Sequence, residues 1–152
     1  TILLVCATAT VFGKVLTMAQ IPTLIVSLVS GLTSSKIILL IILNIMLLIV
    51  GCFMDTVAAI TILAPMLSPL IAAFDIDPIH FGLIMVLNLA IGLCTPPVGS
   101  NLFVASSLTK EPFSEVVRSV LPFLVAMLIS LLVVTYFEPL TLALPWLTGY
   151  AG

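Results

Sequence analysis

The chain has 152 residues, of which 62% are hydrophobic and only 7% are charged, with a net charge of −2 and a mean hydropathy of +1.47. A soluble domain carries about 25% charged residues, so this chain has too little polar surface for a water-soluble protein and lipid must be its solvent. Its apolar stretches are too long for the alternating strands of an outer-membrane barrel, and the small net charge indicates no nucleic-acid partner; an all-α integral membrane protein is predicted.

The first third of the chain contains apolar segments that are each short for a membrane crossing. Residues 1–12 form a partial span that ends near Lys14, and this run begins without Met or a basic region. Such a beginning is unlike a signal peptide and indicates the C-terminal part of a larger protein. Residues 21–33 would reach only about 20 Å as a helix, against a hydrocarbon core of about 30 Å. The next apolar run, from Ile37 to Val50, also falls short.

Residues 37–73 are predicted to form a re-entrant hairpin, in which two half-length helices meet at a tip spanning Gly51 to Thr56. One long helix with a kink at Pro65 is the alternative. A carboxylate such as that of Asp55 is costly at mid-bilayer unless it faces protein, water or an ion, and non-helical backbone is tolerated there only where it lines a cavity. A hairpin tip that forms an ion or substrate site meets both conditions.

The connecting sequence FDIDPIHFG predicts a turn followed by the start of a helix. Asp77 before Pro78 suits an N-cap and a first helical residue. A metal site formed by Asp75, Asp77 and His80 is the alternative, but the spacing suits capping and no further ligands accompany these residues. We therefore expect a capped, water-exposed turn with one histidine at the membrane interface.

A broken helix is predicted over residues 78–108, because the stretch GLCTPPVGSN interrupts an apolar run. Its two prolines lack an amide hydrogen and clash with the preceding turn, and its two glycines allow backbone angles that other residues resist. The carbonyls of the preceding turn then lack partners, which is costly in hydrocarbon. Sodium suits such a site, because a hard cation binds oxygens and the freed carbonyls with the Thr95 hydroxyl supply them. A simple proline kink, satisfied by neighbouring helices, is the alternative.

The charges of two loops predict the topology. The segment SSLTKEPFSEVVRS holds Lys110 and Arg118, half of the basic residues, whereas FDIDPIHFG holds only acids and a histidine. By the positive-inside rule the first is cytoplasmic and the second external, so the hairpin enters from outside. Lys14 would then lie inside, and Lys36 would be the exception.

The C-terminal region predicts one more crossing. The segment 113–119 is expected to be a short interfacial helix, followed by the last span at 120–137. Trp146 and Tyr150 are expected near the outer interface, where their rings are favoured.

Three blocks of the sequence resemble a known family. They are GCFMDTVAAITILAPMLSPLI, IDPIHFGLIMVLNLAIGLCTPPVGSNLFVAS and VLPFLVAMLISLLVVTYFEPL. Together they resemble the large membrane subunit (DctM-like) of TRAP transporters, the tripartite ATP-independent periplasmic family, over nearly the whole chain. The parts IDPIHFG and GLCTPPVGSNLF are highly specific. The family usually has glycine where this chain has Asp75, which we expect to close a helix in a left-handed conformation.

The resemblance implies an ion-transporter-superfamily fold, in which residues 1–152 are the C-terminal part and form the second inverted repeat, with its re-entrant hairpin and broken helix. It implies a multi-pass permease of the bacterial inner membrane that imports small organic anions of the C4-dicarboxylate, sialic acid or 2-oxo acid type. Sodium is the implied coupling ion, with no other cofactor. The implied partners are a small membrane subunit, a periplasmic substrate-binding protein, the anion and the lipid bilayer.

The resemblance also assigns residues to the site. Oxygens in the tip and the break would hold sodium, and the residues concerned are Gly51, Asp55, Thr56, Gly92, Thr95, Pro96 and Gly99. The anion would meet Thr95, Ser100 and Asn101, where the second half-helix presents its N-terminal amide groups. The first repeat, with its own hairpin and substrate contacts, lies outside this chain.

Other functions remain open at this point. A sodium/anion symporter of the same superfamily that needs no binding protein is one, and a copurifying small subunit would distinguish the two. An intramembrane enzyme would use Asp55, but an aspartyl protease needs two carboxylates and no second acid lies within an apolar segment. A membrane scaffold leaves the two broken helices unexplained. We therefore expect a transporter subunit and no enzymatic activity.

Overall fold

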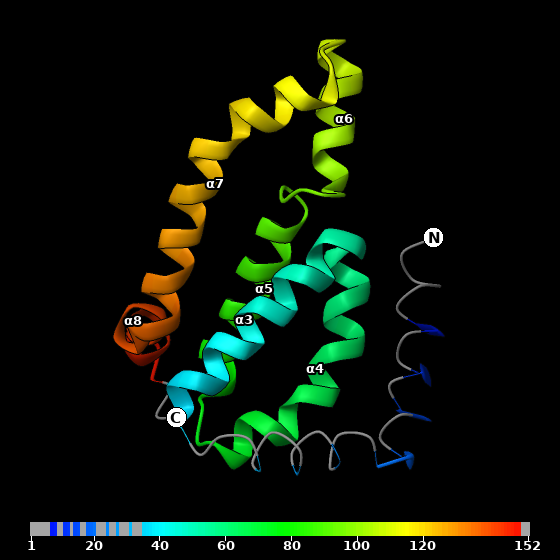
Figure 1. Ribbon diagram of the computed structural model, residues 1–152. Coiled ribbons are helices and arrows are strands. Elements are labelled where there is room, and N and C mark those ends of the chain that lie inside the picture. Colours follow the sequence, from blue (N-terminus) through cyan, green and yellow to red (C-terminus); the bar gives the residue numbers. More distant parts are fainter. Residues whose placement is uncertain are drawn as a thin grey trace.

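The computed structural model describes residues 35–149 and, before them, positions 7–8, 11–12, 14–15, 18–20, 24, 27 and 31. Within residues 35–149 every element is an α-helix, which confirms the all-α prediction (Figure 1). The helices are α3 (Lys36–Phe53), α4 (Thr56–Ala73), α5 (Pro78–Gly92), α6 (Ser100–Thr109), α7 (Phe113–Tyr136) and α8 (Glu138–Leu147). The expected segments at 1–12 and 21–33 lie mostly outside the described residues.

Three of these helices, α3, α4 and α7, are long and apolar enough to cross a membrane. The expectation that the run after Lys36 falls short is therefore wrong. Gly51 and Cys52 stay helical and extend α3 to Phe53, so its 18 residues reach about 27 Å at 1.5 Å per residue.

Helices α3 and α4 form an antiparallel pair whose two open ends lie together (Figure 1). The ammonium of Lys36, at the start of α3, donates a hydrogen bond of 3.2 Å to the carbonyl oxygen of Asp75, just after α4. The same ammonium lies 3.6 Å from the carboxylate of Glu138, at the start of α8. Lys36, the exception to the charge rule, is thus neutralised by partners at the acidic end of the molecule.

Helix α5 starts as the sequence predicts. The Asp77 carboxylate accepts hydrogen bonds from the backbone N–H groups of Ile79 at 2.8 Å and His80 at 3.1 Å, and Pro78 is the first helical residue. Asp75 closes the preceding turn with a φ of 52°, the left-handed conformation expected of it. The expectation of an interfacial histidine is wrong, because His80 is only 1% exposed.

The core lies between α3, α4 and α5. It is built from leucine and isoleucine side chains that recur every three or four residues, such as Leu39, Leu43 and Leu47 on α3 and Ile84 on α5. Helix α3 packs more extensively on α5 than α4 does. A smaller cluster, Ile91, Leu124 and Leu131, joins α5 to α7. The hairpin is thus held mainly through its first arm.

Helix α7 is one continuous helix from Phe113 to Tyr136, rather than a short interfacial helix followed by a span. Pro122 lies inside it, and a proline within an apolar helix removes one hydrogen bond without ending the ladder on either side. A further helix, α8, follows after Phe137. Trp146 on α8 is exposed, and Tyr150 lies outside the described residues.

Candidate functional site

The tip of the hairpin contacts the end of α5 through two glycines. A Cβ added to Gly92 would lie 2.6 Å from the Cα and the carbonyl carbon of Gly51, and a Cβ added to Gly51 would lie 3.0 Å from the Cα of Leu89. Real Cβ atoms do not approach backbone atoms to 2.6 Å, so the contact requires glycine at position 92, and a side chain at position 51 would be tightly crowded. The expected approach of the tip to the break is thus observed as backbone contact.

A cavity of about 260 Å³ lies between the tip and the break. Its lining residues come from both segments: Cys52, Phe53, Met54 and Asp55 from the tip, and Leu93, Val98 and Ser100 from the break. This volume is slightly below the range of about 300–1,000 Å³ of typical ligand pockets. It suits an ion with its waters, or part of a small organic acid.

The residues that line this cavity lie at four helix ends, which Figure 1 shows close together. Helices α3 and α5 end there and direct the negative ends of their dipoles toward it. Helices α4 and α6 begin there and direct the positive ends of their dipoles toward it. One small region therefore offers favourable fields for a cation and for an anion.

Asp55 is the N-cap of α4. Its Oδ2 atom accepts a hydrogen bond of 3.0 Å from the backbone N–H of Val57, and the side chain is exposed at the cavity. Among residues 35–149 no ion pair reaches this carboxylate. Capping thus satisfies one oxygen and leaves Oδ1 available at the tip.

Part of the backbone between Leu93 and Gly99, and the turn before it, is hydrogen-bonded. The expectation that the carbonyls of the preceding turn lack partners is wrong. The Ile91 carbonyl accepts from the Cys94 N–H at 2.9 Å and from the Thr95 hydroxyl at 2.8 Å. The Gly92 carbonyl accepts from the Thr95 N–H at 2.9 Å. Local turns recover these bonds, because the prolines remove donors only from their own positions.

The break is also bridged directly. The N–H of Asn101, in the first turn of α6, donates to the Leu93 carbonyl across the break at 3.2 Å. For the carbonyls of Cys94 and Pro97 no hydrogen bond is found within residues 35–149. Gly99 turns the chain into α6 with a φ of 47°, in the region that glycine adopts most readily.

The residues expected at the site fall into two groups. Gly51, Gly92, Asp55 and Ser100 lie at the tip contact or in the cavity lining. Thr56, Thr95, Pro96, Gly99 and Asn101 are not part of that lining. Thr95 is half-buried with its hydroxyl turned back on α5, and Pro96 faces a small void beside Leu124 of α7.

Comparison with known proteins decides the family. The family described as "Tripartite ATP-independent periplasmic transporter, DctM component" matches residues 1–140. The chain belongs to the DctM family. It is 48% identical over 96% of its length to the C4-dicarboxylate TRAP transporter large permease protein DctM of Pseudomonas aeruginosa, covering 34% of that relative.

Two further DctM relatives differ in the substrate they are named for. Identity is 46% over 89% of the chain to the isethionate TRAP transporter permease protein DctMQ of Oleidesulfovibrio alaskensis, covering 21% of it. Identity is 39% over 93% of the chain to the sialic acid TRAP transporter large permease protein SiaM of Vibrio cholerae, covering 33% of it. The chain thus spans about a third or less of the length of these relatives. Its membership in this family and its three helices that are long and apolar enough to cross a membrane support a multi-pass membrane protein.

The protein also contains a buried row of hydrogen-bonded polar side chains that the sequence patterns did not predict. Asn88 of α5 donates to Asn44 of α3 at 2.6 Å, and Asn44 donates to the hydroxyl of Thr135 on α7 at 3.1 Å. All three side chains are at most 5% exposed. Their signal in the sequence was an isolated amide or hydroxyl residue within each of three apolar runs.

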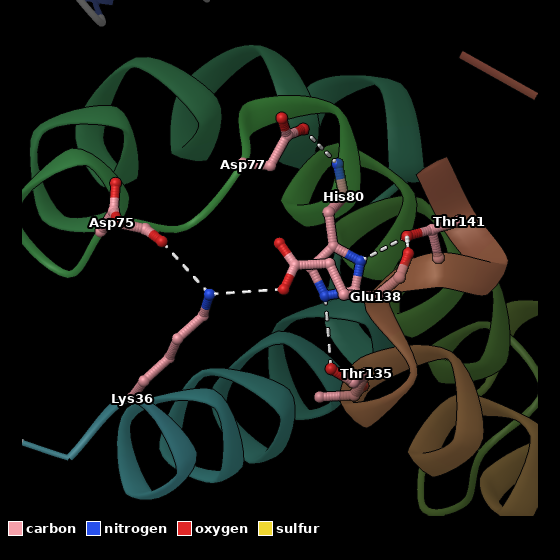
Figure 2. Close-up of polar contacts among 7 residues, drawn as sticks. All are labelled: Lys36, Asp75, Asp77, His80, Thr135, Glu138 and Thr141. Carbon is pink, nitrogen blue, oxygen red and sulfur yellow. Dashed lines mark hydrogen bonds and ion pairs between the residues drawn. The ribbon is translucent and has the colours of Figure 1, made fainter. Parts of the chain in front are cut away.

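Toward the base of the hairpin this chain of contacts continues through His80 (Figure 2). Its ring lies between the Thr135 carbonyl and the Thr141 hydroxyl, next to the Lys36–Glu138 ion pair (Figure 2). The metal site considered for this segment finds no support, because among the described residues no three His, Cys, Asp or Glu side chains are placed to hold a metal ion.

Proposed function

We propose that this chain forms half of the ion and substrate pathway of a sodium-driven TRAP importer of small organic anions. The observation that supports this is the meeting of four helix ends around one cavity, with Gly51 against Gly92. Discontinuous helices that meet within the membrane are typical of secondary transporters. The proposed setting is a bacterial inner membrane, with a small membrane subunit and a periplasmic binding protein as partners.

The hairpin is proposed to re-enter the membrane from the outer side. Its open ends are tied together by Lys36 and Asp75, and its tip contacts the end of α5. Helix α5 has 15 residues, about 22 Å, and α6 continues beyond the break for 10 residues, about 15 Å. A tip at this level lies inside a bilayer whose hydrocarbon core is about 30 Å thick.

Sodium is proposed to bind between the tip and the break. As a hard cation it takes oxygen ligands. Asp55 Oδ1 belongs to a residue of the cavity lining. The adjoining break, outside that lining, supplies the lone pairs of the Thr95 hydroxyl and the carbonyls of Cys94 and Pro97. The ends of α3 and α5 add the negative poles of two helix dipoles.

The anion is proposed to bind at the start of α6. The relatives are named for isethionate, C4-dicarboxylates and sialic acid, all of which carry an acidic group. The N–H groups of Asn101 and Leu102 are used by the carbonyls of Leu93 and Gly99. The exposed Ser100, with its hydroxyl and N–H, is therefore the first contact for such a group.

Thr95→Ala in the intact transporter tests the sodium proposal. Loss of one oxygen ligand should raise the sodium concentration for half-maximal uptake about tenfold, the change that about 1.4 kcal/mol of lost binding produces. The measurement is substrate uptake into proteoliposomes across a sodium titration, with and without the binding protein.

Two matched variants control this test. Thr95→Ser keeps the hydroxyl and should keep the wild-type sodium curve. Thr61→Ala removes a threonine of α4 whose hydroxyl makes the same bond to the carbonyl four residues before, and it should also leave the curve unchanged. An unchanged curve in Thr95→Ala rejects the Thr95 hydroxyl as a ligand, and equal uptake without the binding protein favours the binding-protein-independent symporter.

A further inference from the structure

His80 lies where the base of the hairpin meets the corner between α7 and α8. It is 1% exposed. Its Nδ1 atom lies 2.6 Å from the Thr141 hydroxyl oxygen, and its Nε2 atom lies 3.3 Å from the Thr135 carbonyl oxygen. Figure 2 shows the ring held between these two partners, which come from α8 and α7. Both ring nitrogens are therefore engaged.

The number of hydrogens available in this cluster determines which protonation state of the His80 ring fits its contacts. A carbonyl oxygen only accepts, so Nε2 must carry a hydrogen to bond Thr135. The Thr141 hydroxyl has one hydrogen, and it lies 2.7 Å from the Glu138 carbonyl oxygen, to which it donates. If that hydrogen goes to Glu138, then Nδ1 must also carry one in order to bond Thr141.

Only the cationic imidazolium satisfies all three contacts together. A neutral ring with its hydrogen on Nε2 keeps the Thr135 bond. The single hydrogen of the Thr141 hydroxyl can then be donated either to Nδ1 or to the Glu138 carbonyl, but not to both. A neutral ring with its hydrogen on Nδ1 keeps both Thr141 bonds and turns a lone pair toward the Thr135 carbonyl. Each neutral form loses one hydrogen bond that the cation makes.

Charged and titratable groups surround the ring on several elements. The surrounding titratable groups are Asp77 and Asp75 before α5, Lys36 on α3 and Glu138 on α8, with the exposed Tyr136 on α7.

We propose that His80 is a proton-binding site that ties the N-terminus of α5 to the corner between α7 and α8. Proton uptake adds one hydrogen bond at this junction, and proton release removes it. The packing of α7 and α8 against the base of the hairpin then depends on pH at that side of the membrane. Histidine suits this role because its charge ordinarily changes near neutral pH. The site is independent of which anion is carried.

The test follows the ring nitrogens in the full-length permease that contains this chain, within its membrane complex. The protein is labelled with ¹⁵N-histidine, and the His80 signal is identified by its loss in His80→Gln. A nitrogen spectrum is recorded from about pH 5 to about pH 9, the range in which histidine ordinarily titrates. At the acid end both nitrogens of His80 should carry hydrogens.

Variants of Thr141, with a control on α7, distinguish a proton site from a structural contact. Thr141→Val removes two bonds from the cation and only one from the neutral ring that carries its hydrogen on Nε2, so proton affinity should fall about tenfold. Ser130→Ala should leave the affinity unchanged, because the Ser130 hydroxyl bonds the Ala126 carbonyl of α7 and not the ring. Thr141→Ser keeps the hydroxyl and should restore the wild-type titration.

Two results would overturn the proposal. One is a His80 ring that stays neutral down to the acid end in the wild-type complex. The other is a titration of Thr141→Val that matches that of Ser130→Ala. The wild-type spectrum decides the first point even where a variant fails to accumulate, and Thr141→Ala replaces Thr141→Val for the second.

Discussion

Gly51 and Gly92 show how single residues set the geometry of the site. In the sequence, Gly92 predicts a position at which the helix can break. In the structure both glycines lie within helices, and their role is to let two backbones touch. The contact fixes the tip of the hairpin beside the break. The cavity next to it therefore depends on the absence of two side chains.

Gly92→Ala is expected to displace the hairpin tip. The added methyl would lie 2.6 Å from backbone atoms of Gly51, which cannot rotate away as a side chain can. The cost is about 1–3 kcal/mol in the free energy of unfolding, as for other overpacked sites, together with loss of uptake. The measurements are thermal unfolding of the purified transporter and uptake in proteoliposomes.

Gly82→Ala is the matched control in the same helix. A Cβ at Gly82 meets nothing within 4 Å, so the change should be neutral or stabilise α5 by about 0.5–1 kcal/mol. If Gly92→Ala behaves like Gly82→Ala in both assays, the close backbone contact does not matter for the fold or for transport.

At the scale of the elements, polar contacts align three helices that are otherwise apolar. Leucine and isoleucine faces bring α3, α5 and α7 together without fixing their register, since such side chains pack in many ways. The bonds from Asn88 to Asn44 and from Asn44 to Thr135 form only when the three helices are aligned in one register. Asn88 Oδ1 is buried with no hydrogen-bond partner within the described residues, so the alignment carries a cost.

The two asparagines are expected to be coupled in stability. Asn88→Leu removes the donor to Asn44 and leaves a buried amide oxygen unsatisfied, which costs about 1–3 kcal/mol. Asn44→Leu similarly leaves a buried hydrogen of Asn88 without an acceptor. The double variant contains neither side-chain amide, so no amide is left without a partner. The Thr135 hydroxyl still donates to the Leu131 carbonyl.

The free energies of unfolding of the four proteins form a double-mutant cycle. The double variant should be more stable than the sum of the two single losses predicts, by about 1–2 kcal/mol. Simple additivity would mean that the asparagine pair does not act as a unit.

At the scale of the whole molecule, the acidic and basic loops lie at opposite ends. Figure 1 shows the turn between α4 and α5 at one end and the turn between α6 and α7 at the other. The first turn holds Asp75 and Asp77, and the second holds Lys110 and Glu111. The open ends of the hairpin lie at the acidic end, which the positive-inside rule places outside.

Cysteine labelling is expected to place both ends of the hairpin on the outer side. In a background whose native cysteines are replaced by alanine, Ser35→Cys and Ala73→Cys should react with a membrane-impermeant maleimide in intact cells. Glu111→Cys should react only after the membrane is permeabilised. Labelling of Ser35→Cys and Ala73→Cys from opposite sides would show that the segment crosses the membrane and would reject the re-entrant arrangement.

The sequence by itself determined the class of the protein, because composition and local chemistry act without long-range contacts. Low charge required a lipid-embedded all-α protein, the Asp77–Pro78 pair fixed the start of α5, and Asp75 marked a left-handed turn. The proline pair between two glycines marked the interruption between α5 and α6. Each of these depends on a few neighbouring residues.

Only the tertiary structure decided which groups meet. No local rule gives the hydrogen bonds that the break recovers, the burial of His80 between α7 and α8, or the extension of α3 through Gly51 to Phe53. Those outcomes depend on residues tens of positions apart, such as Asn44 and Thr135. In lipid every buried polar group needs a partner, and the partner is fixed by how the helices pack rather than by the neighbouring sequence.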